Sequence, residues 1–98
     1  MLDDVLRVLG DDRSRSILRE LADADGPLAA QEIAERLEIP QSTTYRKLDR
    51  LSDSELVDER VGLDGGGHHR AHYTVAVDGI VVSLDGDGLR VETRLDGE

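Results

Sequence analysis

The sequence predicts an α+β domain in which helices come first and two β-hairpins follow. Apolar residues recur every three or four positions up to residue 53, which is the spacing of amphipathic helices. From residue 56 onward they alternate with polar residues, as in half-buried strands. The length of 98 residues provides one hydrophobic core and leaves no room for a second. We therefore expect residues 1–98 to form a single domain.

The first two expected helices are separated by Gly10. A short helix in residues 1–10 has one apolar stripe, made of Leu2, Val5, Leu6 and Leu9. The second helix begins at an N-cap, either Asp11 or Asp12, because a short acidic side chain can accept from the free N–H groups of the first turn. Gly26-Pro27 ends this helix.

Two further helices complete the helical part, residues 11–54. The third covers residues 29–37, and Pro40 then forces a turn because the residue before proline avoids the helical region. The fourth extends from about Gln41 to Asp53. Its inward side is expected to consist of residues at positions i, i+4 and i+7, namely Thr44, Leu48 and Leu51.

The remainder of the chain predicts two hairpins. Strands at 56–61 and 68–77 flank a glycine-rich loop, and residues 55–77 form the first hairpin. Residues 78–95 form the second, in which Asp85-Gly86-Asp87-Gly88 turns between two alternating segments. This order of elements is that of a winged helix-turn-helix domain with an extra C-terminal β-hairpin, the first hairpin being the wing.

Three segments resemble the ArsR-type winged-helix transcription regulators, especially their haloarchaeal relatives. These are LGDDRSRSIL at 9–18, EIAERL at 32–37 and QSTTYRKLDRL at 41–51, and they occur in the family's order. The resemblance covers about residues 6–77. It implies a DNA-binding regulator whose fourth helix, residues 41–53, enters the major groove.

Two positions depart from that family. A glycine usually precedes the Leu-Val that opens the wing, but this chain has Glu55. The thiol pair of the metal-sensing members is also missing, because the matching stretch of the third helix reads Ala-Ala-Gln-Glu-Ile at 29–33. Thiol-based metal sensing is therefore not expected, and we expect no cofactor.

The charge has an unusual composition and distribution. The chain carries a net charge of -10, with 14 Asp, 8 Glu, 11 Arg and a single lysine, Lys47. This composition is typical of proteins that work in molar salt, where counterions screen surface repulsion; the alternative is an acidic interaction module. When the charge is summed over the segments 1–25, 26–40, 41–51, 52–61, 62–77 and 78–98, only residues 41–51 are positive, with three basic residues against Asp49. An acidic chain that keeps one basic helix favours an anionic partner there.

The fourth helix supplies most of the candidate DNA contacts. At about 100° per residue, Ser42, Arg46 and Arg50 lie opposite the inward side, with Thr43 and Tyr45 on the flanks. Amide and guanidinium groups can read adenine and guanine bidentately, and hydroxyl groups suit bases or phosphates. Basic residues further along fix the register on the backbone. The expected contacts in this helix are Gln41, Ser42, Thr43, Tyr45, Arg46, Lys47 and Arg50.

The wing is the second candidate contact. Arg70 suits the minor groove or a phosphate, and His68 and His69 can donate to phosphates. The three histidines are not expected to bind a metal, because strand alternation separates His69 from His68 and His72 and no further ligand stands at a suitable spacing. No arrangement of nucleophile, base or phosphate-binding loop is present, so the sequence does not predict an enzyme.

We expect a homodimer on double-stranded DNA in the cytoplasm. The dimer surface is expected to use the stripe of the first helix, the 80–95 hairpin, or both, because one small domain cannot cover either. Neither a membrane-spanning segment nor a secretory signal is expected. Two other hypotheses for the function are also compatible with the sequence. One is a winged helix that binds protein within a transcription complex, and the other is a regulator that senses a small molecule at a dimer interface.

Overall fold

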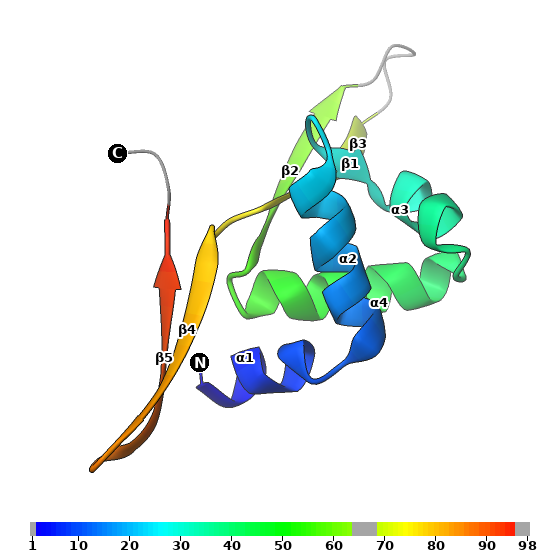
Figure 1. Ribbon diagram of the computed structural model, residues 1–98. Helices are drawn as coiled ribbons and strands as arrows, with labels where there is room; N and C mark the ends of the chain where they lie inside the picture. The colour runs from blue at the N-terminus through cyan, green and yellow to red at the C-terminus, as the bar shows by residue number, and fades with distance from the viewer. Residues whose placement is uncertain (1, 64–68, 96–98) are drawn as a thin grey trace.

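The computed structural model describes residues 2–63 and 69–95, in which helices pack around a small sheet and a second hairpin follows (Figure 1). This arrangement confirms the predicted α+β fold of winged helix-turn-helix type with a C-terminal hairpin. No helix among these residues is long and apolar enough to cross a membrane. In chain order the elements are α1 (Leu2–Leu9), α2 (Asp12–Asp23), β1 (Leu28–Ala29), α3 (Ala30–Leu37), α4 (Gln41–Asp53), β2 (Val57–Leu63), β3 (His69–Val75), β4 (Gly79–Asp85) and β5 (Gly88–Arg94).

The wing belongs to a three-stranded antiparallel sheet in the order β1-β3-β2. Strands β2 and β3 pair from Val57 opposite Val75 up to Leu63 opposite His69. The short strand β1, in which Leu28 pairs with Tyr73, was not predicted, and Ala29 lies in it instead of opening α3. Two residues are too few to show alternation, so this strand exists only through its partner.

The core lies between the helices and the inner face of this sheet. Its helical members lie on the inward sides of their helices. Val8 of α1 is buried among them although the stripe expected for the first helix did not include it. The wing contributes the buried ring of Tyr73, which is one of only two aromatic side chains in the sequence. The buried cluster comprises Val8, Ile17, Leu21, Leu28, Ala30, Ile33, Leu48, Leu51, Leu56, Val57 and Tyr73.

Glu55 connects α4 to the wing in the left-handed conformation, with a φ of 66°. This is the position where the resembling family places glycine, so the chain keeps the backbone turn without the residue that suits it. A side chain with a Cβ pays about 1 kcal/mol or more in this region. With Glu55 in place of glycine, the chain after α4 keeps the left-handed backbone turn, and the conformational strain of this turn is higher than it would be with glycine.

Replacing Glu55 by glycine is expected to raise the free energy of unfolding by about 0.5–1 kcal/mol, because the relief of strain exceeds the entropy that glycine adds to the unfolded chain. Glu55→Ala is the matched control, since it removes the same charge and keeps the Cβ. Denaturant unfolding in high salt measures both variants. The explanation is wrong if the alanine variant gains as much stability as the glycine variant.

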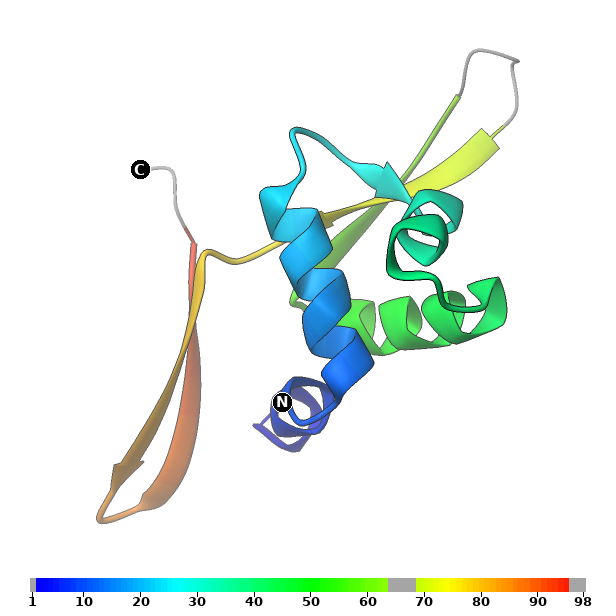
Figure 2. The same cartoon turned by 45° about the vertical axis from the view of Figure 1, so that its right-hand side comes forward.

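The second hairpin, β4 and β5, stands apart from the three-stranded sheet (Figures 1 and 2). Its inner end is held by the half-buried Ile80 and by contacts between β5 and α1. In both views it lies on the side of the molecule away from the wing and from the start of α4. Register places most of its apolar side chains on one face, with Val82 opposite Val91 and Leu84 opposite Leu89.

Candidate nucleic-acid interface

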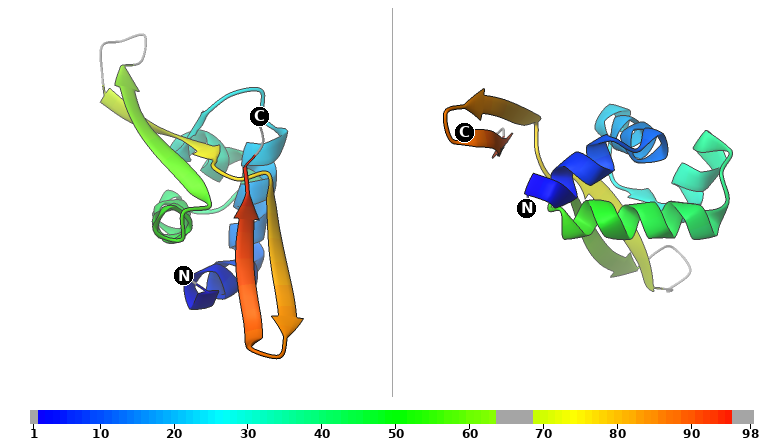
Figure 3. Two further views of the ribbon diagram at one scale, coloured as in Figure 1. Left: turned by 90° about the vertical axis from the view of Figure 1, so that its left-hand side faces the viewer. Right: turned by 90° about the horizontal axis from the view of Figure 1, so that it is seen from below.

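Helix α4 lies along one edge of the helical part, and its N-terminal end projects beyond α2 (Figure 3). Its observed bounds, Gln41–Asp53, are those predicted from the sequence. The side chains on its outer side are exposed to solvent, as helical periodicity predicted. They are Gln41, Ser42, Tyr45, Arg46, Asp49 and Arg50.

Thr43 lies on a flank of α4 as expected, but this residue is only 8% exposed and lies beneath the surface. Lys47 is also drawn inward, with a side chain that is 13% exposed. Lys47 pairs with Asp11 at the start of α2, and Thr43 lies one turn earlier on the same flank, whereas the other flank, with Tyr45, stays open. The buried arc of α4 is therefore wider on one side than the pattern of apolar residues indicated.

The start of α4 is formed by the turn after α3. Pro40 occupies the N-cap position and provides no side-chain hydrogen bond, while the Thr44 hydroxyl donates back to the Pro40 carbonyl at 3.1 Å. The first N–H groups of a helix have no partner within it and carry the positive end of its dipole. Gln41 and Ser42 therefore present exposed side chains beside backbone donors, an arrangement that suits an anion.

Two arginines on the outer side of α4 are not engaged in ion pairs with other described residues. These are Arg46 and Arg50; by contrast, Arg36 pairs with Glu20 at 3.7 Å. Asp49 likewise has no ion-pair partner in the described part of the chain. A guanidinium without a carboxylate partner keeps its donors for a base edge or a phosphate.

The outer face of the wing carries basic residues that face each other across two strands. In the register, Arg60 lies opposite His72 and Gly62 lies opposite Arg70, so Arg60 and Arg70 share one face. Arg60 was not predicted, because its place beside Arg70 depends on a pairing register that the sequence does not reveal. His68 lies outside the described residues, and for His69 only the backbone is described.

Metal-ligating side chains do not gather in the described residues, where no three of His, Asp or Glu stand close enough to hold an ion. His72 instead places its Nδ1 atom 3.2 Å from the carbonyl oxygen of Arg70 on its own strand. This contact orients the ring along the wing.

Tyr73, at the base of the wing, is affected by charged and polar groups of both the wing and α4. Burial raises the pKa of Tyr73 to about 12, and the nearby charge of Glu59 and groups of α4, Tyr45 and Asp49, act in the same direction. The phenol of Tyr73 therefore stays neutral at neutral and mildly alkaline pH. Tyr45 and Asp49 lie on the flank of α4 that faces the wing.

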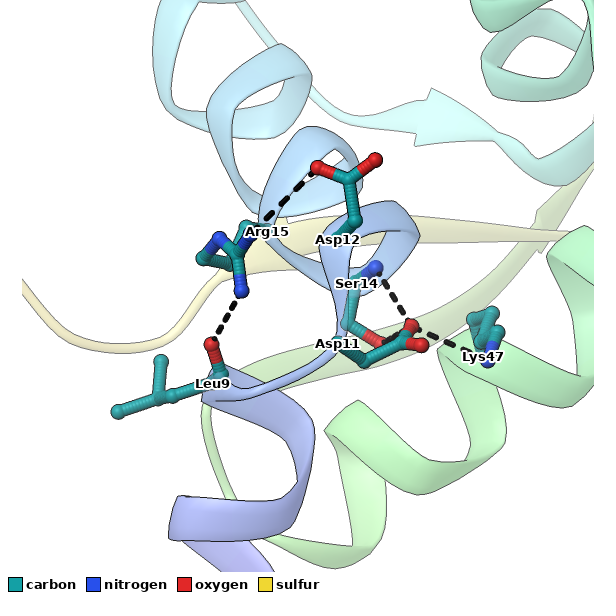
Figure 4. A network of polar contacts seen from close by, with 6 residues as sticks. All are labelled: Leu9, Asp11, Asp12, Ser14, Arg15 and Lys47. Carbon is teal, nitrogen blue, oxygen red and sulfur yellow. Dashed lines mark hydrogen bonds and ion pairs between the residues drawn. The ribbon is translucent and has the colours of Figure 1, made fainter.

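On the opposite flank, Asp11 caps α2 and binds Lys47 of α4 (Figure 4). The hydrogen bond from the Ser14 hydroxyl lowers the pKa of Asp11 to about 2, helped by Lys47 and by the Ser14 backbone N–H and opposed by desolvation. The prediction that Asp11 or Asp12 caps this helix is thus resolved in favour of Asp11.

Acid should destabilise the fold through Asp11. Because its pKa is lower in the folded than in the unfolded chain, its contribution is present above pH 4 and is lost as the pH falls from about 4 to about 2. The side chain is 35% exposed, so after solvent screening we expect about 1 kcal/mol. Urea unfolding at pH 5 and pH 2.5 should show a smaller pH dependence in Asp11→Asn than in the wild type. An unchanged pH dependence in that variant would contradict this assignment.

Only some of the residues expected to form a dimer surface are exposed in the single chain. Val5 is completely buried within the chain, so its inclusion in the dimer stripe is wrong. Leu2, Leu6 and Leu9 are half-buried, and Leu9 packs against the core. On the second hairpin, by contrast, Val82, Leu84 and Leu89 are exposed.

Comparisons with known proteins agree with this architecture. A solved structure of a possible transcriptional regulator from Methanosarcina mazei Go1 superposes with a TM-score of 0.58 at 17% identity, over 74% of this chain. The match spans 62% of that protein's chain, and at this identity it supports the fold alone. No curated protein sequence matches the chain. The family model described as a helix-turn-helix domain matches residues 9–60, more than half of the sequence, and the chain therefore belongs to the helix-turn-helix domain family.

Proposed function

We propose that this protein is a transcription regulator that binds specific sequences in double-stranded DNA. The observation that carries the proposal is the exposed N-terminal half of α4, where Gln41, Ser42 and Arg46 project from the second helix of a helix-turn-helix unit. Proteins of this class place this end of the second helix in the major groove. The resemblance to ArsR-type regulators supports the same function.

Each exposed group has a proposed role. Arg46 reads guanine through its O6 and N7 atoms, and Gln41 reads adenine. Ser42 and Tyr45 contact a base or the adjacent phosphate, and Arg50 contacts a phosphate further along the backbone. The wing adds the basic face with Arg60 and Arg70, and His68 and His69 remain proposed phosphate contacts of the wing.

We also propose that the protein acts as a homodimer in molar salt. The exposed apolar face of the second hairpin supports pairing, since a two-stranded hairpin is marginal when one face stays in water. The excess of Asp and Glu, with a single lysine, supports a saline environment. Two recognition helices related by a two-fold axis would read two half-sites about 34 Å apart, or a multiple of that distance.

Selection of bound fragments from a random duplex library in about 2 M KCl tests this function, because nonspecific electrostatic binding is suppressed at that salt concentration. We expect a two-fold-related motif to emerge. Recovery of no motif at any salt concentration, from protein that circular dichroism shows to be folded, would overturn the proposal.

A second candidate function is a winged helix that binds another protein in a transcription complex. The net charge of -10 favours it, because a strongly acidic surface repels the phosphate backbone outside high salt. The two functions differ in their response to a change in α4. Arg46→Ala strongly weakens binding to the selected DNA site under the first and leaves partner binding largely intact under the second.

A further inference from the structure

The contact between Asp11 and Lys47 joins the start of α2 to the middle of the recognition helix. The Lys47 ammonium lies 3.0 Å from Asp11 Oδ2. The same oxygen accepts hydrogen bonds from the Ser14 backbone N–H at 2.9 Å and from the Ser14 hydroxyl at 2.8 Å. Figure 4 shows the three groups converging between the two helices.

Both partners of the ion pair between Asp11 and Lys47 are fixed by their surroundings. Ser14 is buried in the core and fixes the carboxylate, while the Lys47 side chain lies in the protected space between α2 and α4. A partly buried pair is screened by salt much less than an exposed one. Of the four ion pairs in the described residues, only this one reaches the outer helix α4, and it has the shortest distance.

The residue type is also unusual. Lys47 is the only lysine in a chain that otherwise uses eleven arginines. An ammonium is a compact point charge that can end on one oxygen, whereas the guanidinium of arginine presents a wider planar group of donors. The neighbouring residue Arg46, which points outward from α4, is an arginine.

We propose that Lys47 is a positioning residue, whose ion pair with Asp11 sets the rotation and depth of α4 and thereby aims Arg46. This inference rests on the proposed function for the reading role of α4. It replaces the expectation that Lys47 contacts a phosphate, since its charge is already directed at Asp11. Because 1 Å of misplacement at a recognition surface costs hydrogen bonds, loss of the pair should reduce specific binding.

The replacement Asp11→Asn distinguishes a positioning role of the ion pair from an effect of net charge on DNA affinity. Asparagine caps a helix as well as aspartate does, so α2 keeps its cap while the ion pair is lost. On charge alone, this variant should bind DNA more tightly, because one negative charge disappears and Lys47 is released. Positioning predicts the opposite sign.

The measurement is the ratio of affinities for the selected DNA site and for an unrelated duplex, at a temperature where every variant is fully folded. We expect Asp11→Asn to lower this ratio by about tenfold, a factor that is ordinary for coupled neighbours. The matched control is Asp12→Asn, which makes the same charge change at an adjacent side chain that is 91% exposed and pairs with Arg15 of its own helix. It should leave the ratio within about twofold of the wild type.

A phosphate contact by Lys47 would give different results. Asp11→Asn would then keep or raise the affinity, and Lys47→Met would reduce the dependence of nonspecific binding on salt by about one released ion. Either result overturns the proposal. Positioning requires that Lys47→Met lower the specific ratio while the salt dependence of nonspecific binding stays unchanged.

The failure of the proposed function would be visible separately. If the wild type selects no DNA motif, α4 is not a DNA reader, whatever Lys47 does. The ion pair is then tested by unfolding Asp11→Asn, Lys47→Met and the double variant, together with amide exchange in α4. Non-additive stabilities with faster exchange in α4 support the positioning role, and additive stabilities with unchanged exchange overturn it.

Discussion

Replacing Arg46 by alanine is expected to lower the affinity for the selected DNA site by about 10- to 100-fold. One bidentate contact from an arginine to guanine contributes about 1–3 kcal/mol of discrimination, or about 5- to 150-fold, and the expected loss lies within these limits. Binding to an unrelated duplex should weaken much less, because that binding depends on total charge. Fluorescence anisotropy with the two duplexes in about 2 M KCl measures both quantities.

The control is Arg19→Ala, which removes the same charge from the exposed side of α2. Its affinity for the selected site should stay within about twofold of the wild type, since long-range charge effects are screened in molar salt. If Arg46→Ala and Arg19→Ala behave alike, Arg46 acts only through charge and does not read a base. Arg46→Lys should recover little, because an ammonium cannot form the bidentate contact.

The helical part could be predicted in detail because its signals are local. Gln41 follows a proline that prevents an earlier start, and a periodic stripe continues from there to Asp53. The cap of α2 was narrowed to Asp11 or Asp12, and only the structure shows that the hydroxyl of Ser14 selects Asp11. The bounds and the cap of a helix can thus be predicted from the sequence when residues within or next to that helix determine them.

The features that were not predicted correctly from the sequence depend on contacts with a distant segment of the chain. Thr43 is buried on the flank of α4 that also carries Lys47, and the apolar periodicity within α4 does not report this burial. Strand β1 exists only opposite Tyr73, and Arg60 joins Arg70 only through the register of the wing. Sequence distance hides these contacts, since local patterns identify elements and not their packing partners.

The second hairpin leads to the other large expected effect, a change of oligomeric state. Strands of seven residues at about 3.3 Å per residue present a face about 23 Å long and about 10 Å wide. That is roughly 230 Å² for each copy, well below the 800 Å² that each partner of a stable complex usually buries. A stable dimer must therefore combine this face with the adjoining surface of α1, where Leu2 and Leu6 are half-buried.

Leu84→Asp is expected to convert the dimer to a monomer while leaving the protomer folded. Leu84 is 78% exposed in the single chain, so the aspartate costs the protomer little, but within an apolar interface it would be an unpaired buried charge. Such a charge should weaken association by at least about 100-fold. Sedimentation at tens of micromolar in molar KCl measures the state of each variant.

Val61→Asp is the matched control, because Val61 is an equally apolar strand residue, 65% exposed, on the wing at the other side of the molecule. It should remain a dimer. A dimeric Leu84→Asp would move the interface away from the outer end of the hairpin and toward α1, and a monomeric wild type would overturn the dimer itself. In the latter case the selected DNA motif should be a single half-site, because the spacing of two half-sites is maintained only by a rigid link between two recognition helices.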